Sequence, residues 1–210
     1  MTAVVITRRD ARGLAALLDA VLGQSLPPDA VLVLDRSGGA AIPAAGSDDD
    51  PTEHAVTGDH VTLDHITLDH SAVTVAGVVD TARRTHAVPV TVLPVDPRTP
   101  ARAAAHRALL DPEVDAPPTT LAWLLPVGTT PEPDALVALV DTWRRSPSAG
   151  VVGPKHLDAA DPHLLRALAI RTTRGGRLLS RPRPGEPDQG QYDRSTDALG
   201  VPFAGSLVER

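Results

Sequence analysis

The 210-residue sequence contains no cysteine, no asparagine and a single lysine, and only 2% of its residues are aromatic. Without cysteine, disulfides and thiolate metal sites are excluded. With so few aromatic side chains, a folded core has to be built from valine, leucine, alanine and isoleucine. The hydrophobic content of 42% is that of a globular protein. We therefore expect one domain with a sizeable aliphatic core.

Long apolar runs and a signal-peptide pattern are also absent. No apolar run approaches the roughly 20 residues that span a bilayer, and the first apolar stretch, residues 3–6, is soon followed by Arg8 and Arg9. A net charge of −6 argues against a nucleic-acid-binding surface. We therefore expect a cytoplasmic protein without a nucleic-acid partner.

The order of apolar segments predicts an α/β fold. Residues 3–7 and Ala30–Asp35 are apolar and rich in valine, which is typical of buried strands. Between them, leucines and valines recur at helical spacing after Asp10, a predicted N-cap. A strand, a helix and a strand in succession form a βαβ unit with parallel strands. No Gly-x-Gly-x-x-Gly motif follows the first strand, which argues against a dinucleotide-binding enzyme.

The stretch from 121 to 136 predicts where a ligand binds. Residues 121–125 form an apolar run that suits a strand buried on both faces, and a Gly-Thr-Thr turn follows soon after it. We expect a helix to begin there, with Thr130 as its N-cap and Pro131 at the first helical position. Ligands of open α/β sheets gather at the carboxyl ends of strands, so residues 126–130 should border the site.

The rest of the chain completes an α/β fold with a mostly parallel central sheet. We expect a helix over 73–84, an edge strand with two prolines over 88–95, a helix over 100–110, a short buried strand at 150–152, a helix over 161–168, a hairpin over 170–179 and a final strand over 198–208.

Residues 40–72 predict a variable loop, in which an Asp-His pair recurs every five residues. Its histidines, His60, His65 and His70, are candidate ligands for a divalent metal. A period of five fits neither a helix face nor a strand face, and a tandem duplication explains the repeat as well. The three aspartates at 48–50 predict a solvated acidic stretch rather than a metal motif.

Five short segments along the chain form a recognisable set. They are Gln-Ser-Leu-Pro-Pro at 24–28, Trp-Leu-Leu at 123–125, Pro-Glu-Pro-Asp-Ala-Leu at 131–136, Ser-Pro at 146–147 and Gly-Glu-x-Asp-Gln-Gly-Gln-x-Asp at 185–193. Together they resemble the family 2 glycosyltransferases of the actinobacterial subtype. The resemblance implies a GT-A fold, a Rossmann-like sandwich that binds nucleotide-diphospho-sugars, in a single domain over 1–210. It covers the front portion of a family member, so the domain is expected to be incomplete at its C-terminus.

The same resemblance implies a nucleoside pocket lined by Thr7 and Asp35. For Asp35, a plain turn residue after a strand is the alternative interpretation. The family has an Asp-Gly-Ser turn at this place, whereas here Asp35 is followed by Arg36, Ser37 and Gly38.

Family members hold a divalent cation, Mg or Mn, against the donor diphosphate with two aspartates. Val127 and Gly128 occupy these positions here, so the cation is expected for the family but its ligands are missing. Arg98, Arg102 and Lys155 are candidate phosphate contacts, because charged donors bind phosphate well. Solvated surface arginines are the alternative interpretation.

The polar loop with Asp188 and Gln189 is implied to lie near the acceptor. The family segment that supplies a carboxylate base has no counterpart, so no catalytic residue is assigned. Two functions stay open. One is inverting transfer of a sugar from a nucleotide-diphospho-sugar to an acceptor in cell-envelope polysaccharide or glycan synthesis. The other is a catalytically degenerate domain that binds a nucleotide-sugar or serves as a structural partner. Association with a membrane-bound or partner chain is a further expectation from the family.

Overall fold

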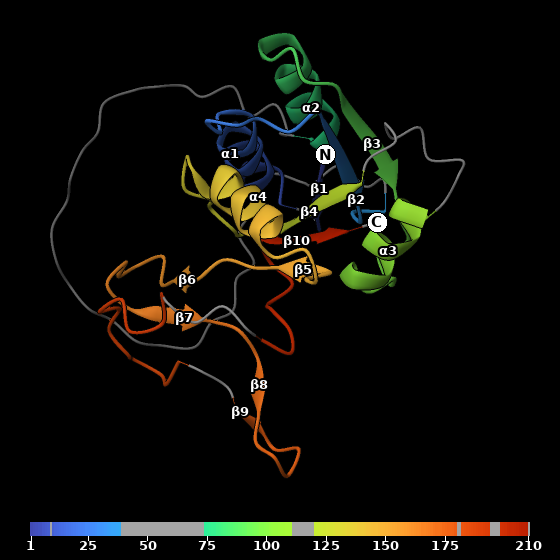
Figure 1. The fold of residues 1–210 in the computed structure, drawn as a ribbon. Helices are drawn as coiled ribbons and strands as arrows, with labels where there is room; N and C mark the ends of the chain where they lie inside the picture. Colours follow the sequence, from blue (N-terminus) through green and yellow to red (C-terminus); the bar gives the residue numbers. More distant parts are fainter. Residues whose placement is uncertain (9, 39–73, 111–119, 180–181, 194–197, 210) are drawn as a thin grey trace, which may run out of the picture.

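The computed structural model describes residues 1–8, 10–38, 74–110, 120–179, 182–193 and 198–209, and these contain a six-stranded sheet with helices on both faces (Figure 1). The strand order is β3-β2-β1-β4-β10-β5. The bounds are Thr2–Thr7 for β1, Ala30–Asp35 for β2, Val90–Pro94 for β3, Leu121–Pro126 for β4, Val151–Val152 for β5 and Ser206–Glu209 for β10.

The four strands from β3 to β4 are parallel, and β10 runs antiparallel between β4 and β5. The predicted α/β class with a mostly parallel sheet is therefore confirmed. Strand β3 lies at the edge of the sheet, as its prolines predict, because proline cannot donate a ladder hydrogen bond. The last strand is shorter than predicted, since the chain turns at Gly205 (φ +71°) immediately before it.

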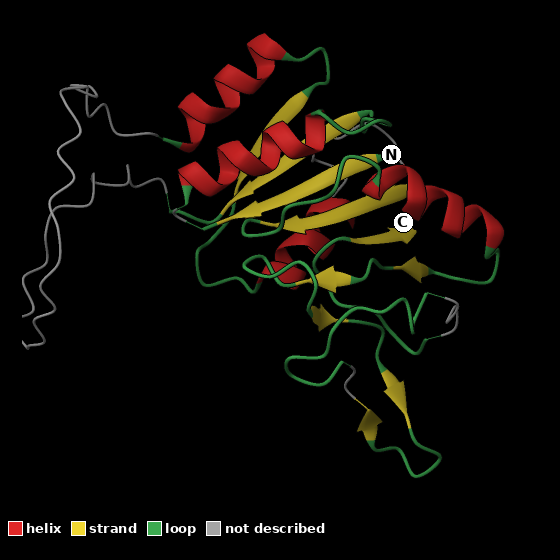
Figure 2. Ribbon diagram, turned by 90° about the vertical axis from the view of Figure 1, so that its left-hand side faces the viewer, coloured by secondary structure: helices red, strands yellow, loops and turns green. Residues whose placement is uncertain are grey.

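Two aliphatic layers cover the two faces of the sheet (Figure 2). Helices α1 (Ala11–Leu22), α2 (Val75–Thr85) and α4 (Ala135–Arg145) pack on one face. Helix α3 (Ala101–Leu110) packs on the other face. The helices predicted at 73–84 and 100–110 are thus confirmed as α2 and α3. Alternating residues of each strand enter the two layers because successive side chains of a strand point to opposite faces.

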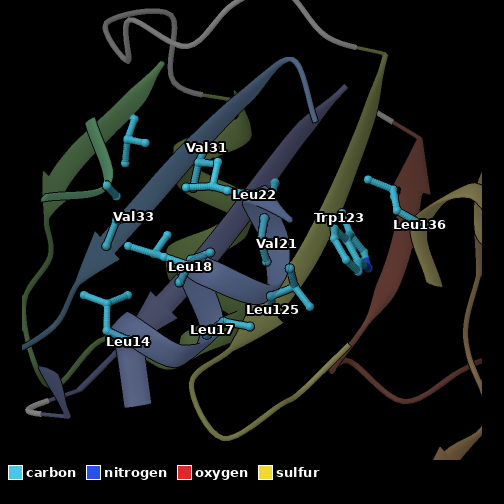
Figure 3. Close-up of a cluster of buried hydrophobic side chains, with 14 of the residues drawn as sticks. Leu14, Leu17, Leu18, Val21, Leu22, Val31, Val33, Trp123, Leu125 and Leu136 are labelled. Carbon is cyan, nitrogen blue, oxygen red and sulfur yellow. The ribbon is translucent and has the colours of Figure 1, made fainter. Parts of the chain in front are cut away.

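The larger core lies between α1, α4 and the sheet. Figure 3 shows the leucines and valines of α1 facing Val31 and Val33 of β2, with Trp123 of β4 near them and Leu136 of α4 beyond. Trp123 is only 1% exposed and is the largest fully buried side chain. The aliphatic core expected from the composition is therefore organised around one aromatic residue.

The start of α1 agrees with the prediction for Asp10. Its Oδ1 accepts a hydrogen bond from the Gly13 N–H at 2.7 Å, which is the contact of an N-cap residue. A β-carbon at Gly13 would collide with the Asp10 carboxylate and with the side chain of Val127. Glycine at this position therefore allows Val127, which follows β4, to pack closely against the first turn of α1.

The prediction that α4 begins at Thr130 and Pro131 is wrong. The helix begins at Ala135, and Asp134 is the N-cap residue, without a side-chain cap bond. The physical reason is the second proline, Pro133. Because a residue before proline is disfavoured in the helical region, Glu132 cannot continue a helix that starts at Pro131.

The predicted helix over 161–168 is also wrong. Strand β7 (Leu165–Ala167) lies there and pairs antiparallel with β6 (His156–Leu157). The Asp158 carboxylate accepts hydrogen bonds from the Ala160 and Asp161 N–H groups, so the chain turns back instead of forming a helix. The predicted hairpin is confirmed by β8 (Arg171–Thr172) and β9 (Leu178–Leu179), which pair antiparallel.

Two groups of predictions fall outside the part of the chain just described. The Asp-His repeat with His60, His65 and His70 and the aspartates at 48–50 lie among residues 39–73.

Within the described ranges, no helix combines the length and the apolar character needed to cross a membrane.

Candidate functional site

The sheet brings the two predicted nucleoside-binding residues together. Thr7 ends β1, Asp35 ends β2, and the two are register partners on adjacent parallel strands. Adjacent strands lie about 4.8 Å apart, and partner residues in register share one face of the sheet. We call the ends of β1, β2 and β3, with Thr7, Asp35 and Arg36, the carboxyl edge. Ligands of open α/β sheets bind at such an edge.

The polar groups of the carboxyl edge are only partly satisfied. The Asp35 Oδ1 accepts from the Ser37 N–H at 2.8 Å, and the Arg36 N–H donates to the Thr7 carbonyl at 3.1 Å. Thr7 is only 1% exposed, yet its Oγ1 has no hydrogen-bond partner within the described residues. A buried hydroxyl without a partner costs free energy, so its presence at a sheet edge indicates a place where a ligand completes the bonding.

Arg36 is a residue of this edge that the sequence interpretation did not select. Its Nη2 donates to the Pro97 carbonyl at 3.0 Å, and its buried Nε has no partner within the described residues. The signal that could have found it is its position, since it directly follows Asp35 where the family that the sequence resembles has glycine. The guanidinium lies beside Pro97, just beyond the end of β3.

At the two positions of the turn after β4 where the resembled family has aspartates, the side chains offer no ligand for a divalent cation. The Val127 N–H donates to the Ile6 carbonyl at 2.9 Å, and its side chain packs against the core. Gly128 has φ +99°, a conformation that side-chain-bearing residues rarely adopt. The hydroxyl of Thr129 donates to the Pro126 carbonyl at 2.7 Å. Across the described ranges, no three His, Asp or Glu residues are grouped so as to hold a metal ion. Val127 and Gly128 therefore do not fit the cation expected from the family resemblance.

The three predicted phosphate contacts lie in different surroundings. The guanidinium of Arg102 lies 5.6 Å from the ring centroid of Phe203, a cation–π arrangement. Arg98 is exposed, and its backbone N–H donates to the Asp96 carboxylate at 2.8 Å. Lys155 is ion-paired with Asp188 and Asp193. The structure therefore does not gather these three cations into one site.

Lys155 joins the segment after β5 to the predicted acceptor loop. Its ammonium lies 2.6 Å from the Asp188 carboxylate and 2.8 Å from that of Asp193. The hydrogen bonds to these carboxylates raise the pKa of Lys155, and the bond from Lys155 lowers the pKa of Asp188. Lys155 is thus held as a cation between two carboxylates, a setting that favours a role in fixing the loop.

The loop over 183–193 is held by its own hydrogen bonds as well. The Tyr192 hydroxyl donates to Glu186 at 2.7 Å, and this bond is the main cause of a lowered pKa of Glu186. The Gln189 N–H donates to the Gln191 side chain at 2.7 Å. Asp188 and Gln189, the two residues predicted near the acceptor, therefore lie in a loop that is tied both internally and to Lys155.

A cavity of about 420 Å³ lies beside α4. Trp123, Leu125 and Leu139 contribute apolar walls, and the turn over 128–132 and the segment over 154–159 contribute polar groups. We call it the α4 cavity. Its volume and mixed lining are those of small-molecule sites. The turn after β4 lies between this cavity and the carboxyl edge, because Val127 packs toward α1 whereas residues 128–132 line the cavity.

Among the titratable residues that line the α4 cavity, His156 is the one whose pKa is shifted mainly by burial. Burial lowers its pKa, and a hydrogen bond with the backbone of Ala204 acts weakly in the opposite direction. Its Nε2 is buried and has no partner within the described residues. The imidazole is therefore neutral at neutral pH.

The free energy of unfolding should fall as the pH is lowered from 7.5 to 5.5. The folded protein disfavours protonated His156, whereas the unfolded chain takes up this proton as the pH passes below about 6.5. The stabilisation that comes from keeping His156 neutral is therefore fully present above pH 6.5 and is lost as the pH falls below it. Urea denaturation at pH 7.5 and pH 5.5 gives the free energy of unfolding at each pH, and the difference between the two values should be smaller for His156→Gln than for the wild type. The exposed His163 provides the control, and an unchanged difference in His156→Gln would contradict the assignment.

Known proteins match this chain in structure but not in sequence. No protein-family model and no curated protein sequence matches it. TarS from S. aureus, residues 1–349, has a TM-score of 0.51 and 10% identity, over 99% of this chain and 46% of that one. The mannosyltransferase PcManGT from Pyrobaculum calidifontis, in complex with GDP-Man and Mn²⁺, has a TM-score of 0.48 and 19% identity, over 76% of this chain and 36% of that one.

The likeness to these solved structures concerns the fold. This chain spans less than half of either structure, and both identities are below 20%. The nearly complete coverage of this chain by TarS includes the six-stranded sheet and both helical layers. The chain therefore has a mixed α/β fold, built on a mostly parallel central sheet, and this fold is similar to that of TarS residues 1–349.

Proposed function

We propose that this chain binds a nucleotide-diphospho-sugar at the carboxyl edge and serves as the donor-binding domain of a family 2-type glycosyltransferase. The observation that carries the proposal is the pairing of Thr7 with Asp35 at the ends of two parallel strands, with the Thr7 hydroxyl buried and without a hydrogen-bond partner among the described residues. A carboxylate beside a free hydroxyl can accept and donate hydrogen bonds to a nucleoside. The acceptor belongs, by the family resemblance, to a cell-envelope polysaccharide or glycan.

Donor binding in this proposal does not use a metal ion at the β4–α4 turn. Val127 and Gly128 offer no oxygen or nitrogen from a side chain, and the hydroxyl of Thr129 is bonded to Pro126. The charge of a departing diphosphate still needs stabilisation. Arginines near the carboxyl edge, among them the exposed Arg98, are the cationic groups available for it.

The acceptor is proposed to enter from the side of the α4 cavity. The cavity adjoins the carboxyl edge across a single turn and is large enough for a small molecule. Lys155 lines it and also binds Asp188, so the predicted acceptor loop is attached to its wall. This arrangement would bring an acceptor group next to a sugar held at the turn after β4.

A second function is favoured by the turn itself. With valine and a positive-φ glycine at the two metal positions, the chain suits a catalytically degenerate domain that binds a nucleotide-sugar or supports a partner chain. Sugar transfer in the presence of a candidate acceptor would exclude this alternative, whereas donor binding without transfer would favour it.

Replacing Asp35 by asparagine is expected to weaken donor binding about tenfold or more. The substitution keeps the oxygen that accepts from the Ser37 N–H but removes the negative charge, and a hydrogen bond to a charged group contributes about 1.5–3 kcal/mol. Isothermal titration with UDP-, GDP- and dTDP-sugars, each with and without Mn²⁺, measures the effect. The wild type should bind at least one of them, with the same affinity in both conditions.

Asp19→Asn is the matched control, because Asp19 is exposed on α1 away from the strand ends. It should bind donor as the wild type does. Donor binding that requires Mn²⁺, or equal weakening by both substitutions, would contradict the proposed site. No binding of any donor would contradict the proposed function as a whole.

A further inference from the structure

The arginines of this acidic protein are unevenly distributed along the chain. Residues 162–185 contain six arginines and no aspartate or glutamate, although the whole chain has a net charge of −6. The hairpin of β8 and β9 lies within this stretch, and we call residues 170–179 the basic hairpin. It projects from the molecule on the side away from the six-stranded sheet (Figure 1, Figure 2). A cationic element therefore extends beyond a body of opposite charge.

Three of these arginines, Arg171, Arg174 and Arg177, lie on the basic hairpin itself. Its turn is closed by backbone bonds, because the Thr173 N–H donates to the Arg177 carbonyl at 2.9 Å and the Gly176 N–H donates to the Thr173 carbonyl at 3.0 Å. Gly176 has φ +78°, a conformation that glycine adopts without strain. The hairpin thus gathers three positive charges within residues 171–177.

The charges of these three arginines are not neutralised within the described part of the chain. Arg174 and Arg177 are exposed, and Arg171 is partly buried. None of the three guanidinium groups has a described carboxylate within 4.0 Å. By contrast, Arg166, which precedes the hairpin, lies 3.3 Å from the carboxylate of Asp158. Cations that stay free on a projecting hairpin are suited to bind an anionic surface.

Two exposed apolar side chains lie at the base of the basic hairpin. Leu199 is 72% exposed, the largest fraction among the large hydrophobic residues of the described ranges, and Ile170 is 40% exposed. Their backbones are joined, because the Leu199 N–H donates to the Ile170 carbonyl at 3.0 Å. Apolar side chains beside basic ones are typical of segments that bind at a lipid interface. A soluble anionic polymer would use the charges alone, so the apolar pair favours a lipid surface.

We propose that the basic hairpin binds the protein to an anionic lipid surface. Arg171, Arg174 and Arg177 contact the phosphate groups of the lipid headgroups, and Ile170 and Leu199 enter the interface beside them. Each basic residue near an anionic leaflet strengthens binding about fivefold, the equivalent of about 1 kcal/mol. Because the hairpin projects, its arginines reach the lipid while the acidic body stays farther away. The inference does not depend on donor binding at the carboxyl edge.

Sedimentation of the full chain with lipid vesicles tests the proposal. Vesicles of equal parts of phosphatidylcholine and phosphatidylglycerol should bind the wild type at least about tenfold more tightly than vesicles of phosphatidylcholine alone. The combined variant Arg171→Gln, Arg174→Gln and Arg177→Gln should bind the anionic vesicles about 100-fold more weakly. The same three positions replaced by lysine keep the charge and should retain the binding. A wild type that binds neither kind of vesicle, or both alike, would overturn the proposal.

A matched triple variant controls for the loss of charge. Arg12→Gln, Arg107→Gln and Arg145→Gln remove the same charge from exposed positions on α1, α3 and α4. Together they should weaken binding to the anionic vesicles less than about threefold, because these positions lie outside the hairpin. Equal weakening by the two glutamine triples would show that net charge decides, which contradicts the proposal. Thermal melting followed by circular dichroism checks folding, and Arg174→Gln alone should still weaken binding about fivefold.

Leu199→Ser distinguishes a lipid surface from a soluble anionic polymer. It should weaken binding to the anionic vesicles about tenfold, since an apolar side chain no longer leaves water on binding. Leu110→Ser is the control, because Leu110 is 58% exposed on α3, and it should bind as the wild type does. Unchanged vesicle binding by Leu199→Ser would overturn the lipid assignment. Inorganic polyphosphate should then bind the wild type about as tightly as the anionic vesicles do.

Discussion

Trp123→Ala is expected to lower the free energy of unfolding by about 3–5 kcal/mol, the range for truncating a buried aromatic side chain. Trp123 is 1% exposed in the central strand β4 and packs in the larger core. Its Nε1 donates to the Gly205 carbonyl at 3.1 Å, which ties β4 to the turn before β10. The loss therefore combines a cavity with a broken hydrogen bond. Urea denaturation followed by circular dichroism measures it.

Two further variants separate these causes. Trp123→Phe keeps most of the packing and leaves the Gly205 carbonyl without its partner, so it should cost about 1–2 kcal/mol. Trp143 is the only other tryptophan and is partly buried on α4, so Trp143→Ala should cost less than half as much as Trp123→Ala. Equal costs for the two alanine variants would show that the core is not organised around Trp123.

Gln24→Ala is expected to lower the free energy of unfolding by about 2–3 kcal/mol, because it leaves buried backbone groups unpaired. Gln24 is 5% exposed and its side chain connects α1 to α4. Its Oε1 accepts from the Leu136 N–H at 3.0 Å, and its Nε2 donates to the Glu132 carbonyl at 2.8 Å. A glutamine 112 residues away along the chain thus takes the place of the missing N-cap bond of α4.

The effect of Gln24→Ala should extend to the α4 cavity, because Glu132 lines it. Amide hydrogen exchange should therefore quicken in the first turn of α4 while β1 stays protected. Ser25→Ala is the control, since the side chain of Ser25 is exposed, and it should change the unfolding free energy by less than about 0.5 kcal/mol. Unchanged exchange at Leu136 in Gln24→Ala would contradict the clamping role.

The predictions from periodicity and composition held where a local pattern and the tertiary contacts agree. Strands β1, β2 and β4, helix α1 with its Asp10 cap, and the edge position of β3 are all confirmed. Each has a continuous apolar run or an apolar helical face, so burial alone favours the structure that the local sequence prefers.

The predictions failed where one contact overrides a local signal. The start of α4 was placed at Thr130 because threonine before proline is a good helix start, but Pro133 prevents it and Gln24 supplies the first bond. The helix expected over 161–168 became β7, because pairing with β6 satisfies its backbone. For α4 the deciding signals are Pro133 and a glutamine 112 residues away. For β7 the deciding partner is strand β6, which a turn at Asp158 brings alongside.

Some residues of the candidate site were predicted from the sequence, and one was not. Thr7, Asp35 and the replacement of two aspartates by Val127 and Gly128 were found from sequence segments that resemble a known family. The roles of these positions remain predictions. Arg36 was missed because an arginine after a strand has no pattern of its own. The burial of its Nε, which has no partner in the part of the chain that the structure describes, is visible only once Pro97 and the end of β3 are placed around it.

The sequence by itself determined the α/β class, the aliphatic core and the presence of valine and glycine at positions 127 and 128, because these depend on which residues are present and on their local spacing. Only the tertiary structure decided that Thr7 lies beside Asp35, that Lys155 is shared by Asp188 and Asp193, and that Gln24 holds α4. Those contacts join residues that are distant along the chain. Their formation depends on how the sheet and helices pack, and no local pattern records that.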